Sequence, residues 1–164
     1  MKTIYIVRHA KSSWDSFDLS DHERPLMNVG IKKTKKVIDY LNNNKVAPDV
    51  IISSSAVRAY ETAKLIAEGI DYNTDLIVRN KALYHAGVDD IYDELFAIDN
   101  AVNSAMIVAH NPTLTDFVND FITPSIVNLP TTGAVCVEFE TEKWENVADA
   151  EFKVNFVVFP RMLS

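Results

Sequence analysis

Apolar residues along the chain occur in short runs, and segments with helical spacing separate these runs. The first run, 3–7, is β-branched and aromatic and stops at Arg8, as a fully buried strand does. Similar runs predict strands at 50–52, 76–78 and 105–109. Residues at helical spacing lie between and after them, namely Ile31, Thr34, Ile38 and Leu41; Ala56, Ala59, Tyr60, Ala63 and Ile66; Ile91, Leu95 and Ile98; and Leu114, Phe117, Val118 and Phe121. This alternation predicts an α/β sandwich around a mostly parallel sheet.

The alternation of strand-like and helical segments ends after Pro130. Two strand-like stretches, 134–139 and 152–159, follow without a clear long helix between them, so we expect at least one antiparallel strand to complete the sheet. The chain of 164 residues contains no internal repeat and no low-complexity tract, which predicts a single domain over 1–164.

Composition narrows the class of partner. The chain carries 23 Asp and Glu against 16 Lys and Arg, and its formal charge of -7 argues against nucleic acid. The one cysteine, Cys136, excludes an internal disulfide and a multi-cysteine metal site, consistent with a reducing compartment. No apolar stretch approaches the roughly 20 residues that span a bilayer. We therefore expect a soluble cytoplasmic protein with no membrane partner.

The residues that follow the predicted strands share one chemistry. Arg8 and His9 leave the first strand, Arg58 follows the second in the first turn of its helix, and His110 leaves the strand at 105–109. Carboxyl ends of parallel strands meet at one sheet edge, where ligands bind in such folds. Asn111 can then cap the next helix, with Pro112 at its first position.

Two arginines and two histidines at one edge predict a phosphate-like ligand. Guanidinium groups bind phosphate oxygens bidentately, and a helix N-terminus adds backbone donors. A neutral imidazole can attack phosphorus while a protonated partner stabilises charge on the equatorial oxygens. Because side chains supply the cations, no metal and no cofactor are expected, and the chain has no H-E-x-x-H metal motif.

The sequence resembles the histidine phosphatase superfamily, and within it the short SixA-type phosphohistidine phosphatases. The resemblance extends from the start of the chain to about Phe139. It rests on Arg8-His9, on the stretches 54–62, 83–86, 108–112 and 129–133, and on Glu23-Arg24-Pro25-Leu26 followed by Gly30. It implies a three-layer α/β/α sandwich of the phosphoglycerate mutase-like type, with a mostly parallel central sheet and an antiparallel member.

The resemblance also implies roles for residues at the predicted edge. His9 would be the nucleophile that becomes phosphohistidine, Arg8 and Arg58 would hold the phosphoryl group, and His110 would be the second histidine of the pocket. The family usually has glycine after the nucleophile, where this chain has Ala10, a change that the short subgroup often shows.

Other roles stay open between two interpretations. Arg24 would be an added phosphate contact or a salt-bridged loop residue, and Ser12 falls where relatives carry a serine near phosphate. The proton donor would be Asp15, whose pKa a bound phosphate dianion would raise, or His85, which could equally be structural. The lysines at 32, 33, 35 and 36 form a solvated helix face or contact an acidic partner.

Three functions are compatible with these residues. The first is a metal-independent phosphatase that works through a phosphohistidine on His9 and removes phosphate from phosphohistidine in a protein. An imidazole leaving group needs less protonation than an alkoxide, so a site with a weak or missing proton donor favours this function. The second is a phosphomonoesterase or mutase for a small phosphorylated metabolite, and the third is a phosphate-recognising module without turnover. The sequence leaves the oligomeric state open.

Overall fold

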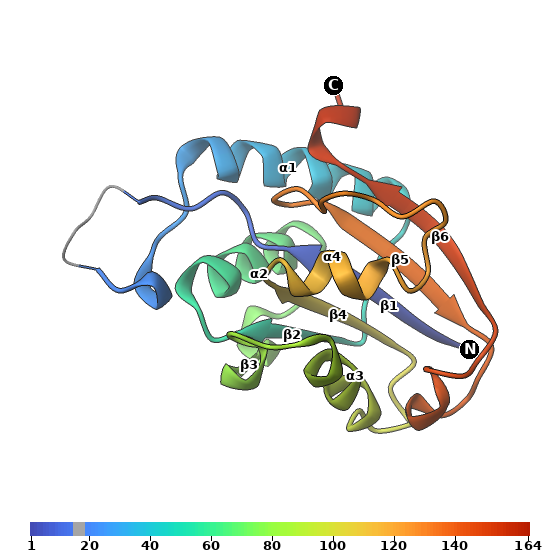
Figure 1. The fold of residues 1–164 in the computed structure, drawn as a ribbon. Coiled ribbons are helices and arrows are strands. Elements are labelled where there is room, and N and C mark those ends of the chain that lie inside the picture. The colour runs from blue at the N-terminus through green and yellow to red at the C-terminus, as the bar shows by residue number, and fades with distance from the viewer. Residues whose placement is uncertain (15–18) are drawn as a thin grey trace.

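The computed structural model of the chain describes residues 1–14 and 19–164. Within these ranges six strands form one sheet in the order β3-β2-β4-β1-β5-β6 (Figure 1). The strands are β1 Lys2–Arg8, β2 Val50–Ser54, β3 Val78–Asn80, β4 Ser104–Ala109, β5 Ala134–Phe139 and β6 Phe152–Val158. The first four run parallel where they pair, and β5 is antiparallel to both of its neighbours, β1 and β6. A mostly parallel sheet with an antiparallel member is therefore confirmed.

Helices cover both faces of the sheet. The helices are α1 Asn28–Asn43, α2 Val57–Gly69, α3 Val88–Phe96 and α4 Thr113–Val118. Apolar side chains of α1 and α2 pack with Val7, Ile51 and Val108 in one core, and those of α3 and α4 pack with Ile4 and Ile6 in the other. Neighbouring positions of one strand thus enter different cores, which explains the continuous apolar run of β1. The three-layer α/β/α sandwich is confirmed (Figure 1).

Two predicted boundaries are wrong in detail. The strand predicted at 76–78 begins only at Val78, because the residues before it form the 3₁₀ helix Thr74–Leu76. The side chain of Asn73 accepts a hydrogen bond from the Asp75 amide at 3.0 Å and stabilises that turn. Helix α4 begins at Thr113, so Pro112 is its N-cap residue and not its first helical residue.

Asn111 lies one residue before the N-cap of α4, and not at the N-cap as predicted, but its side chain still supports the start of the helix. Its Oδ1 accepts a hydrogen bond from the Thr115 amide at 3.1 Å, and its Nδ2 donates to the Leu129 carbonyl at 2.8 Å. The side chain thus satisfies one of the unpaired amides of the helix and ties this turn to the loop before β5. This link fixes the chain directly after His110.

The loop after β1 is held against the start of α1. The Lys11 carbonyl accepts a hydrogen bond from Met27 at 2.9 Å, and the Ser13 amide donates to Pro25 at 2.8 Å. A Cβ at Gly30 would lie 2.6 Å from the Lys11 oxygen, so only glycine permits this approach. The segment that follows His9 is therefore fixed by backbone contacts. In the described ranges, no helix is both long enough and apolar enough to cross a membrane.

Candidate active site

His9 lies directly after β1 and is buried, with 7% of its surface exposed. Its Nδ1 is 2.7 Å from the Ala10 carbonyl oxygen, and because a carbonyl can only accept, Nδ1 carries the proton. Burial lowers the pKa of His9 to about 4; the hydrogen bond to Ala10 opposes this shift, and the charges of Arg58 and Arg8 add to it. At neutral pH the imidazole is therefore uncharged, with a lone pair on Nε2.

Contacts from α2, β4 and the loop before β5 hold the backbone around His9. The Ala10 amide donates to Thr62 Oγ1 at 2.9 Å, and that hydroxyl donates to the Arg58 carbonyl at 2.7 Å. The His9 amide donates to the Ala109 carbonyl at 3.1 Å, and the Thr132 amide donates to the His9 carbonyl at 3.2 Å. The backbone that carries the imidazole is thus held by three elements that are far apart in sequence.

His110 follows β4, and its ring centroid lies 5.2 Å from that of His9. Its Nε2 is 2.7 Å from Ser54 Oγ, and its buried Nδ1 has no hydrogen-bond partner among the described residues. Burial lowers the pKa of His110 to about 3, and the charges of His9 and Arg58 lower it further. This ring is therefore also neutral at pH 7 while the site holds no anion.

Two arginines beside these histidines have donors that are unused. Arg8 donates from Nη1 to the Leu129 carbonyl at 3.0 Å, and Arg58 donates from Nη1 to the Asp21 carbonyl at 2.7 Å. The buried Nε of each guanidinium has no partner within the described part of the chain. Burial and the like charge of Arg58 lower the pKa of Arg8. Two close cations with unsatisfied donors form a site that favours an anion.

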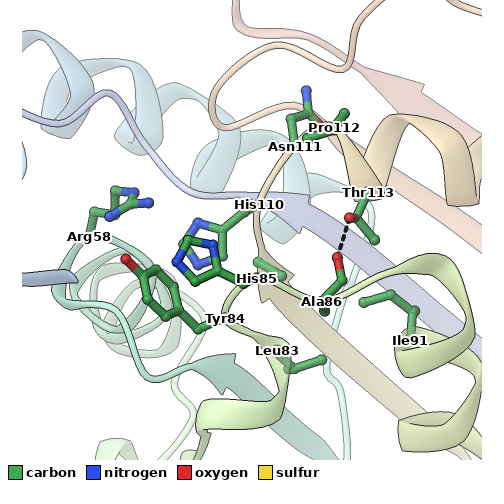
Figure 2. A pocket seen from close by; sticks show the side chains of 11 residues that line it. Arg58, Leu83, Tyr84, His85, Ala86, Ile91, His110, Asn111, Pro112 and Thr113 are labelled. Carbon is green, nitrogen blue, oxygen red and sulfur yellow. Dashed lines mark hydrogen bonds between the residues drawn. The ribbon is translucent and has the colours of Figure 1, made fainter. Parts of the chain in front are cut away.

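The side chains lie around two adjoining pockets. The His110 pocket, of about 340 Å³, is lined by Arg58, Leu83, Tyr84, His85, Ala86, Ile91, Ala109, His110, Asn111, Pro112 and Thr113 (Figure 2). The His9 pocket, of about 450 Å³, is lined by Arg8, His9, Lys11, Ser12, Trp14, Arg24, Met27, Lys33 and Thr131. The rings of His110 in one pocket and His9 in the other are neighbours, so the two pockets lie side by side. The structure thus brings together the two arginines and two histidines that follow separate strands.

Comparison with known proteins points to one family. Residues 4–81, just under half of the chain, match the model of the histidine phosphatase superfamily (branch 1). The chain is 33% identical over 111 residues to an uncharacterized protein of Mycobacterium leprae, an alignment that covers 66% of each chain. Overall, the alignments cover between 32% and 66% of the length of the curated relatives that this chain matches.

Solved structures of SixA proteins share the fold of this chain. A SixA structure from Agrobacterium tumefaciens superposes with a TM-score of 0.80 at 23% identity, covering 97% of this chain and 98% of that one. The protein histidine phosphatase SixA complexed with tungstate gives a TM-score of 0.79 at 20% identity and covers 98% of both chains. The phosphoglycerate mutase-like fold expected from the sequence is thereby confirmed.

Arg24 forms the salt bridge that one interpretation of the sequence expected. Its Nη1 donates to Asp21 Oδ1 at 2.8 Å, its Nε donates to the Ser13 carbonyl at 3.1 Å, and its Nη2 donates to Ser12 Oγ. Arg24 and Ser12 also line the His9 pocket, so an ion pair at one edge of the guanidinium is compatible with a ligand in that pocket.

Asp21 is the site residue that the sequence reasoning missed. Its carboxylate accepts hydrogen bonds from Arg24 and Arg58, and from Tyr84 Oη at 2.6 Å. Burial raises the pKa of Asp21, but the hydrogen bonds from Tyr84 and Arg24 and the charge of Arg58 outweigh it and hold the pKa below its usual value. Its position three residues before Arg24 could have indicated it, because several arginines in one site are stabilised by a nearby carboxylate.

The two candidate proton donors have different outcomes. His85 lines the His110 pocket, and its ring lies 4.0 Å from that of Tyr84, between centroids (Figure 2). Asp15 lies outside the described residues. Among the residues that are described, no group of three or more His, Cys, Asp or Glu is arranged to hold a metal ion.

Proposed function

We propose that this protein is a metal-independent phosphatase that forms a phosphohistidine on His9 and removes phosphate from phosphohistidine in a protein. The observation that carries the proposal is the state of His9. Its Nδ1 proton is used by the Ala10 carbonyl, its pKa is lowered to about 4, and Arg8 and Arg58 lie beside it. A neutral imidazole with a defined tautomer next to two cations is suited to attack a phosphoryl group.

The proposed reaction has two displacement steps. In the first, phosphoryl oxygens bind to Arg8 and Arg58, and Nε2 of His9 attacks phosphorus. The bond from phosphorus to the substrate nitrogen breaks, and the departing imidazole keeps the electron pair and takes a proton from solvent. In the second, water attacks phosphorus, the bond to His9 breaks, and the water proton passes to solvent as phosphate leaves. An incoming dianion favours protonation of His110, whose buried Nδ1 has no hydrogen-bond partner in the part of the chain that the structure describes.

The choice of a nitrogen-linked phosphate rests on the acids among the described residues of the site. None of the described residues lining the His9 pocket or the His110 pocket is Asp or Glu. The nearby Asp21 is held ionised by its three hydrogen-bond donors and has no proton to give at neutral pH. An alkoxide leaving group needs a strong general acid, whereas an imidazole does not. The likeness of the fold to SixA, which is described as a protein histidine phosphatase, is consistent with this choice.

A comparison of substrates tests the proposal. Turnover of a phosphohistidine protein, a sugar phosphate and an aryl phosphate is measured with a chelator present, for the wild type and for His9→Ala. We expect the phosphohistidine protein to give the highest kcat/KM and His9→Ala to abolish its turnover. A preference for the sugar phosphate would instead support a metabolite phosphomonoesterase, and unchanged turnover by His9→Ala would refute the proposed nucleophile.

A further inference from the structure

The His9 pocket continues into a second, smaller hollow along the start of α1. This hollow, of about 190 Å³, is lined by Lys33, Pro130, Thr131, Phe159, Pro160 and Arg161. Lys33 and Thr131 line both the hollow and the His9 pocket, so the two form one groove that begins at His9. The 3₁₀ helix Pro160–Met162, which carries Arg161, packs against α1 and forms the far end.

The side chains of this groove are basic. Lys11, Arg24, Lys33 and Arg161 line it, and no Asp or Glu is among the described lining residues. Lys11, Lys33 and Arg161 are exposed and form no ion pair with any residue of the described ranges. Lys36, three residues after Lys33 on the same helix, is also exposed and extends this face by one turn. We name this surface, from Lys11 through Lys33 to Arg161, the basic groove.

The local charge is opposite to that of the whole protein. The chain has a formal charge of -7, yet every charged residue among the described lining residues of this groove is a Lys or an Arg. An extended polyanion would meet repulsion over the rest of the surface, whereas a short acidic segment would be attracted only where the groove lies. A surface of this kind affects orientation and specificity more than overall affinity.

The groove also has apolar surface that suits a polypeptide. Phe159 and Pro160 line the far hollow, and Trp14 at the near end is 73% exposed. The Arg24 guanidinium carbon lies 3.2 Å from the centroid of the Trp14 ring, which keeps this large side chain in place at the rim. A partner with both acidic and apolar groups therefore fits the groove better than a small, purely charged ligand.

We propose that the basic groove binds an acidic peptide segment next to the phosphorylated residue of a protein substrate. The segment would extend from the phosphoryl group at His9 past Lys33 toward Arg161. This inference rests on the proposed phosphohistidine phosphatase function and adds the chemistry of the substrate sequence. It also assigns a role to the lysine-rich face of α1, which the phosphoryl chemistry itself does not need.

Two matched phosphohistidine peptides test the inference. They differ only on one side of the phosphohistidine, where one carries Asp and Glu and the other carries Ser and Asn. We measure kcat/KM for both with the wild type, with Lys33→Ala/Arg161→Ala, and with Lys153→Ala as the control. Lys153 is exposed and lies opposite Glu138, near the start of β1 and at the other end of the sheet from His9.

We expect the wild type to prefer the acidic peptide by roughly tenfold at low salt, and to lose this preference as ionic strength rises. Each exposed charge pair contributes a factor of about three, so the double variant should lose roughly tenfold with the acidic peptide and less than about twofold with the neutral one. Lys153→Ala should behave as the wild type. The neutral peptide reports in each case that the variant is folded and active.

Equal kcat/KM of the wild type for both peptides would overturn the inference, as would equal losses of the double variant on both. Failure of the underlying function would look different: neither peptide would be dephosphorylated in a His9-dependent way. The two failures are therefore distinguishable in one set of measurements.

Discussion

The two buried histidines should make the stability of the protein strongly dependent on pH. Burial lowers the pKa of His9 to about 4 and that of His110 to about 3, whereas an unfolded histidine titrates near 6.5. Between about pH 6.5 and 4 the unfolded chain therefore binds more protons than the folded one. Because stability rises with pH wherever the unfolded state binds more protons, acidification through this window destabilises the fold.

The size of the effect follows from the shifts. One pKa unit corresponds to about 1.4 kcal/mol, so lowering the pH from 7 to 5 should cost about 2 kcal/mol for each histidine and about 4 kcal/mol for both. This is a large part of the roughly 5–15 kcal/mol that stabilises a domain. The carboxylate of Asp21, whose pKa is lowered, contributes in a different range: its stabilisation is complete above about pH 4 and is lost only below it.

Urea unfolding at pH 7 and pH 5 measures the effect, with the fluorescence of buried Trp144 as the signal. The matched variant is His9→Asn/His110→Gln, because Asn can keep the donor to the Ala10 carbonyl and Gln can keep a contact to Ser54. We expect the loss between the two pH values to be about 4 kcal/mol smaller in this variant than in the wild type. The buffer must contain no phosphate, because a bound anion would stabilise the folded state. The same loss in both proteins would refute the assignment of two neutral, buried imidazoles.

Three further predictions concern the arginines and the loop beside His9. In steady-state kinetics, Arg58→Ala should lower kcat/KM by about 10²- to 10³-fold, because the substitution removes donors to the charge that develops on the phosphoryl group. Arg58→Lys should keep part of the activity. Asp21→Asn should lower the free energy of unfolding by only about 1 kcal/mol, because its side chain is 40% exposed and solvent screens its ion pairs; a loss beyond about 3 kcal/mol in urea would contradict this. Gly30→Ala should cost roughly 1–3 kcal/mol and reduce turnover, because its Cβ would press on the Lys11 backbone; an unchanged thermal midpoint would show that the loop shifts freely.

Much of the fold could be predicted from the sequence because each strand has its own apolar signature. The antiparallel strand β5 has the predicted bounds, Ala134–Phe139, and β1 extends the predicted 3–7 by one residue at each end. The prediction at 76–78 was wrong because hydropathy does not distinguish a short strand from the turn that the Asn73 side chain stabilises. A local hydrogen bond of one side chain decides that boundary.

Part of the candidate site could also be predicted from the sequence, and part could not. Arg8, His9, Arg58 and His110 could be placed together because parallel strands bring their carboxyl ends to one edge, a property of topology that the sequence pattern conveys. Asp21 could not be found in that way. It is the first residue of the short 3₁₀ helix Asp21–Glu23 and reaches Arg58 and Tyr84 through contacts between residues 37 and 63 positions apart, which have no periodic signal in the chain.

The most direct test of the central claim is a search for the covalent intermediate. The enzyme is mixed with excess phosphohistidine protein, quenched in alkali within milliseconds to seconds, and analysed by peptide mass spectrometry for a phosphoryl group. We predict an alkali-stable, acid-labile phosphoryl group on His9 that rises and decays with turnover and is absent in His9→Ala. Binding of the phosphoprotein without any phosphoenzyme, or a phosphoryl group on another residue, would contradict the account.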